Sequence, residues 1–255
     1  MLKTPVIAFL GIGLMGHPMA LRLLQSGFAV RAWNRTAGKA ERLREAGAEP
    51  CATVADTVRG AAIVVSMLED GAAVGAVIDA AIASLAPGTL WIDMSSTQHG
   101  EALAFHARMD AAEVSFLDAP VSGGVAGAEA GSLAIMAGGS IGNFAHAEPI
   151  LAAMGRPTLV GPAGSGQIAK LCNQLIVGGT LNIVAEALLL AQAATLILPQ
   201  CARRFAAGSL KAAFWRCTAS ACSTVTSCPA GRSKASSRIY ATCWWRRPTR
   251  ASCCR

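Results

Sequence analysis

Short apolar runs rich in β-branched residues alternate with longer stretches rich in alanine and leucine along the first part of the chain. A continuous apolar run between turn residues predicts a buried strand, and a longer Ala/Leu-rich stretch predicts a helix. The predicted elements are strands at 6–11, 29–34, 63–68 and 90–95, and helices at 14–26, 36–47 and 72–84. Because this alternation is typical of βαβ units, we expect an α/β fold with a parallel sheet covered by helices on both faces.

Further strand-like runs follow at 114–120, 133–139 and 158–162, and the pattern then changes. Residues 165 to about 194 form one long helical pattern without strand signals, which indicates a domain boundary just before it. Beyond Ala194 neither helical nor two-residue apolar spacing is sustained. We therefore expect a sheet domain, then one long helix, then a segment that is poorly ordered.

The charge of the chain is divided in the same way. The 255 residues carry a net charge of +7, but residues 1–194 hold 11 basic and all 15 acidic residues, a net charge of −4. Residues 195–255 hold the other 11 basic residues and no acid, together with seven of the nine cysteines. The body of the chain therefore gives no indication of a nucleic-acid-binding protein, and its two cysteines give none of a disulfide framework.

The N-terminal run leads directly into a glycine turn without a small-residue cleavage site, so it predicts a first strand rather than a signal peptide. The longest apolar stretch, 171–198, is interrupted by polar residues, which favours a buried or interface helix over a membrane span. These residues are Asn173, Gln174, Asn182, Glu186 and Gln192. We expect a cytoplasmic protein that is not bound to a membrane.

A glycine-rich loop follows the first predicted strand. Gly11, Gly13 and Gly16 have G-x-G-x-x-G spacing and open a predicted helix, which is the context of a dinucleotide-binding loop. The first glycine permits a tight turn, the second lets the backbone approach a pyrophosphate, and the third allows close packing of helix on strand. The predicted cofactor loop is Gly11, Ile12, Gly13, Leu14, Met15 and Gly16. The alternative is a glycine turn that binds no ligand.

The end of the second predicted strand bears on the choice of cofactor. An NAD-specific fold places a carboxylate there on the ribose 2′-hydroxyl, but this chain has the neutral Asn34, followed by Arg35 and Thr36. Arg35 and Thr36 can donate hydrogen bonds to a 2′-phosphate, so the sequence favours NADP over NAD. The alternative for Arg35 is a solvated surface charge.

Two further motifs follow, "FLDAPVSGG" at 116–124 and "GSGQIAKLCNQ" at 164–174. Together with "GIGLMGHPMA", "SML" and "IDMSS", in this order and spacing, the chain resembles the β-hydroxyacid dehydrogenase family, which includes 3-hydroxyisobutyrate dehydrogenase and tartronate semialdehyde (2-hydroxy-3-oxopropionate) reductase. The resemblance covers residues 5 to about 194. It implies a Rossmann-type NADP-binding domain at 1–163 and the start of an all-α domain at 164–194, leaving 195–255 without a counterpart.

Lys170 is the candidate for the proton transfer that accompanies hydride transfer to a carbonyl group. A lysine beside a cationic nicotinamide, with its pKa lowered by that charge and by desolvation, can donate this proton. No other lysine lies between Lys39 and Lys211, and Asn173 and Gln174 follow within one helical turn, where they can orient substrate or water. The alternative is a surface lysine.

The resemblance also implies roles for other residues. Ser122, Gly123 and Gly124 would hold the substrate carboxylate through a hydroxyl and backbone N–H groups. Further, Ser96 would lie near the nicotinamide ribose, and Met67 and Leu68 beside the cofactor. Gln174, where the isobutyrate enzymes usually have Asn, is closer to the tartronate semialdehyde branch.

The four histidines lack the spacing of metal ligands, and we expect no metal. For Cys172 we expect a buried structural thiol. For the family as a whole the resemblance implies a homo-oligomer, which is doubtful for this chain without the rest of the all-α domain.

The segment 195–255 has the composition of coding sequence translated in a wrong frame, rich in Arg, Cys, Ser, Ala and Trp. Codons that encode 236–242 can be chosen so that the frame one nucleotide earlier reads Gln-Leu-Lys-Asp-Leu-Arg-Asn, which restores the family's second lysine in a K-D motif. The same shift turns 204–215 into a segment similar to the family's "RGG" helix. We infer a frameshift between Ala191 and Thr195.

Three functions remain open at this point. The first is an NADP-dependent oxidoreductase that interconverts a small β-hydroxyacid and its semialdehyde. The second is a non-catalytic dinucleotide-binding remnant of such an enzyme. The third is a basic interaction protein that acts through its tail. As an explanation of the basic tail, a dedicated nucleic-acid-binding arm is weaker than translation in a wrong frame.

Overall fold

The computed structural model describes residues 6–197, 199–201 and 204. It divides the chain into two compact units, Met1–Lys170 and Leu171–Arg255. The predicted out-of-frame tail, 195–255, therefore lies mostly outside the described residues, as does the proposed position of the second family lysine.

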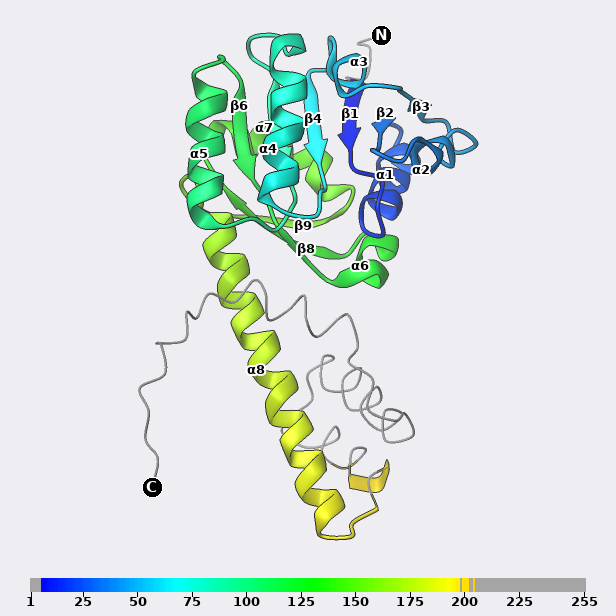
Figure 1. Ribbon diagram of the computed structural model, residues 1–255, viewed down its shortest axis with the longest axis vertical. Helices are drawn as coiled ribbons and strands as arrows, with labels where there is room; N and C mark the ends of the chain where they lie inside the picture. Colours follow the sequence, from blue (N-terminus) through cyan, green and yellow to red (C-terminus); the bar gives the residue numbers. More distant parts are fainter. Residues whose placement is uncertain (1–5, 198, 202–203, 205–255) are drawn as a thin grey trace, which may run out of the picture. The chain divides into compact units, whose positions relative to one another are not determined.

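A twisted sheet forms the centre of the first unit (Figure 1). Six of its strands follow the order β3-β2-β1-β4-β5-β6, and neighbouring strands in this series are parallel. Their bounds are β1 (Val6–Leu10), β2 (Ala29–Trp33), β3 (Glu49–Pro50), β4 (Ile63–Ser66), β5 (Leu90–Asp93) and β6 (Ser115–Asp118). This is the strand order of a doubly wound dinucleotide-binding fold, so the predicted fold class is confirmed.

The sheet continues past β6 with a change of direction. The further strands are β7 (Val121–Ser122), β8 (Leu133–Gly138) and β9 (Gly155–Gly161). β8 is antiparallel to β6 and β7, and β9 is parallel to β8. The expected parallel sheet therefore does not extend to β8, which runs in the opposite direction. Between β6 and β8 lie only β7 and the short helix α6 (Gly124–Ala130), and the chain turns back along the sheet instead of crossing over it.

Helices cover both faces of the sheet because alternate strand residues point to opposite sides. Ile7 and Phe9 of β1 belong to one buried apolar cluster, while Ala8 and Leu10 belong to the other. The first cluster includes residues of α1 (Gly16–Gln25), α2 (Ala37–Glu41), α6 and α7 (Ile141–Ala152), and the second includes residues of α3 (Val54–Val58), α4 (Gly71–Ala81) and α5 (His99–Asp110). A 3₁₀ turn, η1 (Ile82–Ser84), follows α4.

The sequence pattern assigned no helix to α5 or α7, although both carry local start signals. Gln98 and Glu101 form a capping box before α5, and the Ser140 side chain accepts a hydrogen bond from Asn143 N at the start of α7. The helix predicted at 36–47 is shorter than expected, because α2 ends at Glu41 and turns follow it. These capping residues were the sequence signal that could have located the two helices.

The helix α8 (Ser165–Ala193) confirms the long helix predicted after the sheet. It begins in the first unit and continues in the second. Within the described part of the chain it is the helix that is long and apolar enough to cross a membrane, by length and composition only. A core helix of a soluble protein meets the same criterion, so the expectation of a protein not bound to a membrane stays a prediction.

Candidate dinucleotide and substrate site

The carboxyl ends of five parallel strands form one row. Leu10 of β1 is in register with Trp33 of β2 and with Ser66 of β4, Ser66 is in register with Asp93 of β5, and Asp93 with Asp118 of β6. The loops that leave this row carry the predicted cofactor residues. In open α/β sheets ligands bind at this edge, where the strand order reverses between β1 and β4.

The glycine loop has the geometry of a phosphate cradle. Gly11 has φ +104°, and a Cβ on it would collide with the Met67 carbonyl oxygen. In the same way, a Cβ on Gly16 would collide with the Gly11 carbonyl oxygen, so these two glycines let α1 and the loop after β4 approach β1 closely. A Cβ on Gly13 would meet nothing within 4 Å. Gly13 therefore faces open space, which is where a pyrophosphate approaches the backbone.

Asn34 supports this loop from the end of β2. Its Oδ1 accepts a hydrogen bond from Ile12 N at 3.0 Å, and its Nδ2 donates to the Thr36 carbonyl at 3.1 Å. Arg35 and Thr36 are exposed beside it. The structure thus gives Asn34 a bracing role that the sequence did not suggest, while its contact with a ribose stays a prediction. No carboxylate occupies this position at the end of β2.

A buried carboxyl group organises the loops after β4 and β5. Asp93 Oδ1 accepts hydrogen bonds from the hydroxyls of Ser66 (2.7 Å) and Ser95 (2.6 Å), and Leu68 N donates to Ser95 Oγ at 2.9 Å. Burial raises the pKa of Asp93 to about 6, against the opposing effect of these hydrogen bonds. The network fixes the main chain at Leu68, while Ser96 of the next loop is exposed.

Lys170 lies on the first two turns of α8, against the segment that contains the predicted carboxylate-binding residues. Its Nζ donates a hydrogen bond of 2.7 Å to the Val121 carbonyl, and burial lowers the pKa of its amine. Ser122 follows Val121 directly and is half-buried, and Gly123 and Gly124 have φ values of +137° and +61°. The structure therefore brings Lys170 to the segment that carries Ser122–Gly124.

Asn173 and Gln174 lie further along α8, in the second unit, and are half-buried. The Oδ1 atom of Asn173 is buried and has no hydrogen-bond partner among the described residues. The neighbouring Cys172 is exposed, so the expectation of a buried structural thiol is wrong. An apolar neighbourhood in sequence did not predict burial, because this part of α8 exposes other large apolar residues such as Leu175 and Ile176.

Sequence reasoning missed three residues that connect these parts. Asp118 is fully buried, and its carboxylate accepts hydrogen bonds from Gly164 N and Gln167 N and contacts His106 Nε2 at 2.8 Å. Gln167 bonds to the loop after β5, and Thr97 of that loop has a buried hydroxyl without a partner in the described part of the chain. Asp118 and Gln167 both lie inside the two quoted motifs, which was the available signal.

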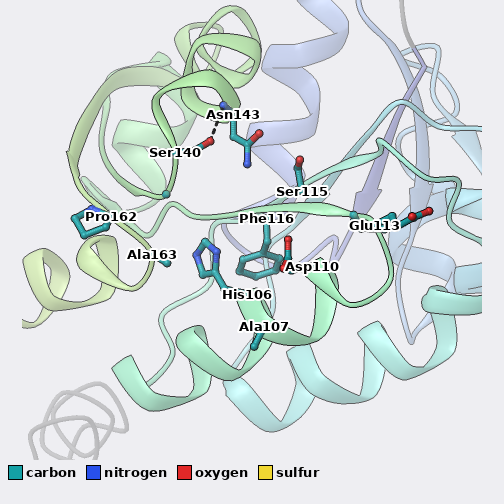
Figure 2. A pocket seen from close by; sticks show the side chains of 12 residues that line it. His106, Ala107, Asp110, Glu113, Ser115, Phe116, Ser140, Asn143, Pro162 and Ala163 are labelled. Carbon is teal, nitrogen blue, oxygen red and sulfur yellow. Dashed lines mark hydrogen bonds between the residues drawn. The ribbon is translucent and has the colours of Figure 1, made fainter.

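A cavity of about 630 Å³ lies elsewhere on the first unit (Figure 2). It is lined by α5, the start of β6, the segments that follow β8 and β9, and the first turn of α7, with His106, Asp110 and Asn143 among its polar residues. None of the predicted site residues lines it. Within the described ranges, no group of three or more His, Cys, Asp or Glu side chains could hold a metal, and the expectation of no metal stays a prediction.

Comparison with known proteins agrees with this geometry. Residues 6–178, more than half of the chain, match the family described as the NAD binding domain of 6-phosphogluconate dehydrogenase. An NAD-dependent L-serine dehydrogenase from Pseudomonas aeruginosa is 38% identical over 210 residues, which cover 80% of this chain and 70% of the relative. A 3-hydroxyisobutyrate dehydrogenase from the same organism is 39% identical over 188 residues, which cover 72% of this chain and 63% of the relative.

Among solved structures, 3-hydroxyisobutyrate dehydrogenase from Mycobacterium tuberculosis with L-serine superimposes with a TM-score of 0.76 at 33% identity. The match covers 81% of this chain and 72% of that one. The chain thus spans about two thirds of the length of these relatives. It belongs to the NAD(P)-dependent β-hydroxyacid dehydrogenase family, with a dinucleotide-binding domain of the 6-phosphogluconate dehydrogenase type.

Proposed function

We propose that this protein interconverts a small β-hydroxyacid and its semialdehyde, with NADP as the hydride carrier. The observation that carries the proposal is the position of Lys170: a partly buried amine with a lowered pKa, hydrogen-bonded to the carbonyl of Val121 beside Ser122. Because its pKa is lowered, Lys170 releases its proton more readily than an exposed lysine does, and it can therefore serve as acid and as base.

The open space at Gly13 and the collisions that a Cβ on Gly11 or Gly16 would cause fit a dinucleotide at the glycine loop. When bound, such a cofactor supplies or accepts the hydride. In the direction of reduction, the ammonium of Lys170 gives its proton to the carbonyl oxygen as that oxygen gains negative charge, and the neutral amine then takes a proton from water. In the direction of oxidation, the neutral amine accepts the hydroxyl proton.

Ser122, Gly123 and Gly124 would bind the substrate carboxylate. A hydroxyl group and successive backbone N–H groups suit a carboxylate, and the positive φ values of both glycines allow a backbone turn that presents N–H groups on one side. Asn173 and Gln174, which follow Lys170 within one turn of α8, stay the candidates for orienting a polar substrate group.

The relatives suggest which class of substrate this site takes. Their names specify L-serine and 3-hydroxyisobutyrate. Both molecules carry a hydroxymethyl group on the α-carbon of a carboxylate and differ only in the remaining substituent. We therefore assign the same skeleton, a 2-substituted 3-hydroxypropanoate, to the substrate of this protein. Gln174 indicates 2-hydroxy-3-oxopropionate as substrate. This molecule fits the same skeleton, because it is the aldehyde formed when a 3-hydroxypropanoate with a 2-hydroxyl substituent is oxidised at its 3-hydroxyl group.

The preference for NADP rests on the end of β2, where the exposed Arg35 and Thr36 follow the neutral Asn34. A guanidinium group binds a 2′-phosphate and gives no comparable advantage with a 2′-hydroxyl. The NAD-dependent relative supports the other choice, so the two cofactors have to be compared directly on this protein.

The second candidate function is binding of the dinucleotide without catalysis. It is supported by the glycine loop, whose geometry at Gly11, Gly13 and Gly16 suits a dinucleotide whether or not hydride transfer follows. Binding without turnover would support this candidate, whereas turnover by the full chain would contradict it.

The test is NADPH oxidation by the full chain with tartronate semialdehyde, comparing Lys170→Met with Lys39→Met. Lys39 is an exposed lysine on α2 and serves as the matched control. We expect Lys170→Met to lose at least about a hundredfold in turnover, the usual contribution of a general acid, while NADPH affinity is retained. Retained turnover in Lys170→Met would contradict the acid/base role.

A further inference from the structure

The side chain of Gln167 connects two elements of the first unit. It lies in the first turn of α8 and is only 3% exposed. Its Nε2 donates a hydrogen bond of 2.8 Å to the Ser95 carbonyl, and its Oε1 accepts one of 3.1 Å from Thr97 N. Since Ser95 and Thr97 flank Ser96, one side chain holds the main chain on both sides of that residue.

This double contact requires a primary amide of this length. An amide donates and accepts at the same time, whereas a carboxylate only accepts and a methionine thioether does neither well. An asparagine is one methylene group shorter. The loss of the amide would leave a main-chain carbonyl and a main-chain N–H of the loop without these partners, at a cost in free energy that favours movement of the loop.

The first turn of α8 is itself fixed on the sheet. Gln167 N and Gly164 N donate to the two carboxylate oxygens of Asp118, at 3.1 and 2.8 Å, and Asp118 is fully buried. A Cβ on Gly166 would collide with carbonyl oxygens of β6 and β8, so this turn lies directly on the main chain of both strands. The main chain just before Lys170, which lies three residues after Gln167, is therefore held in a fixed position on the sheet.

We propose that Gln167 is a positioning residue, which fixes the loop containing Ser96 relative to the part of α8 that contains Lys170. Ser96 is the residue assigned to the nicotinamide ribose, and Lys170 the residue assigned to the reacting oxygen. The inference rests on the proposed function for these two assignments. Gln167 acts through its neighbours, since its amide is already engaged by the main chain on both sides of Ser96.

The experiment compares the binding of two ligands to the full chain by calorimetry. NADPH reaches from the glycine loop to the nicotinamide end, whereas adenosine 2′,5′-bisphosphate occupies the adenine end alone. In Gln167→Met we expect NADPH to bind about tenfold more weakly, the effect of losing somewhat more than one net hydrogen bond, and the bisphosphate to change by less than about twofold. Gln25→Met is the matched control, because Gln25 is an exposed glutamine on α1.

Hydrogen exchange of the ligand-free protein supplies a second readout. Thr97 N–H is held by Gln167, so its exchange in Gln167→Met should be at least about tenfold faster, while amides of the β1 core keep their protection. Gln167→Glu keeps an acceptor for Thr97 but places a second oxygen against the Ser95 carbonyl. This variant should weaken NADPH binding in the same selective way, and it provides the test if Gln167→Met does not fold.

A merely structural role for Gln167 would weaken both ligands together, and that result overturns the inference. Unchanged NADPH affinity with unchanged exchange at Thr97 overturns it as well. Failure of the proposed function gives a different result, namely turnover that survives Lys170→Met while the selective effect of Gln167→Met on NADPH remains. If the wild-type chain binds no NADPH, the cofactor assignment fails. The positioning role is then tested by hydrogen exchange alone: faster exchange of Thr97 N–H in Gln167→Met supports it, and unchanged exchange overturns it.

Discussion

Replacement of Asp93 by asparagine should make the protein more stable at neutral pH and leave it nearly unchanged at pH 4. Asp93 is 1% exposed, and burial raises its pKa from 3.8 to about 6. A carboxyl group whose pKa is higher in the folded state binds more protons there than in the unfolded chain. Its contribution to stability is therefore fully present below about pH 4 and is lost as the pH rises through about 6.

The magnitude follows from the size of the shift. A difference of about two pKa units, at about 1.4 kcal/mol for each unit, means that the charged Asp93 costs the folded protein about 3 kcal/mol above pH 6. Asparagine keeps an oxygen that can accept the hydrogen bonds of Ser66 and Ser95 and carries no charge. The free energy of unfolding of Asp93→Asn minus that of the wild type should increase by about 2–3 kcal/mol between pH 4 and pH 7.

The assay is urea unfolding of both proteins at several pH values, followed by circular dichroism. Titrating groups that do not interact with Asp93 contribute equally to both proteins and cancel in the difference. Asp110→Asn is the control, because Asp110 is an exposed carboxylate at the end of α5, and its substitution should shift the difference by less than about 0.5 kcal/mol. A difference between Asp93→Asn and wild type that stays constant from pH 4 to pH 7 would refute the reasoning.

Three further outcomes are expected. Arg35→Ala should weaken NADPH about ten- to a hundredfold, the value of a charge-assisted hydrogen bond, and leave NADH within about twofold; equal losses in titration calorimetry would exclude a 2′-phosphate contact. Gly13→Ala should weaken dinucleotide binding and leave the free energy of unfolding unchanged, whereas Gly16→Ala, which crowds the Gly11 carbonyl, should lower the free energy of unfolding in urea by about 1–3 kcal/mol. Equal stability of the two variants would contradict the finding that Gly13 faces open space and Gly16 does not. Because burial lowers the pKa of Lys170, the rate of carbonyl reduction should fall as the pH rises through that lowered pKa; a rate that is independent of pH up to the ordinary lysine range would contradict a proton-donating Lys170.

The sequence predicted the first strands and their parallel direction well, because buried parallel strands are continuous apolar runs that local pattern alone identifies. It also located the glycine loop, since Gly11 and Gly16 are required by backbone contacts within one βα unit. By contrast, it did not predict the reversal at β8. It also did not predict the helices α5 and α7, whose apolar periodicity is weak and whose local signals are a capping box and a single capping serine.

The sequence by itself determined the fold class, the cofactor loop and the identity of Lys170 as the candidate acid, because each depends on residue types at short spacing. Only the tertiary structure showed that Lys170 donates to the Val121 carbonyl, that Asp93 is a buried carboxyl group with a raised pKa, and that Gln167 bridges 95–97. Burial and long-range hydrogen bonds depend on which segments pack together. Gln167 is separated from its partners by 70 and 72 residues, and a local sequence pattern cannot predict a contact across that separation.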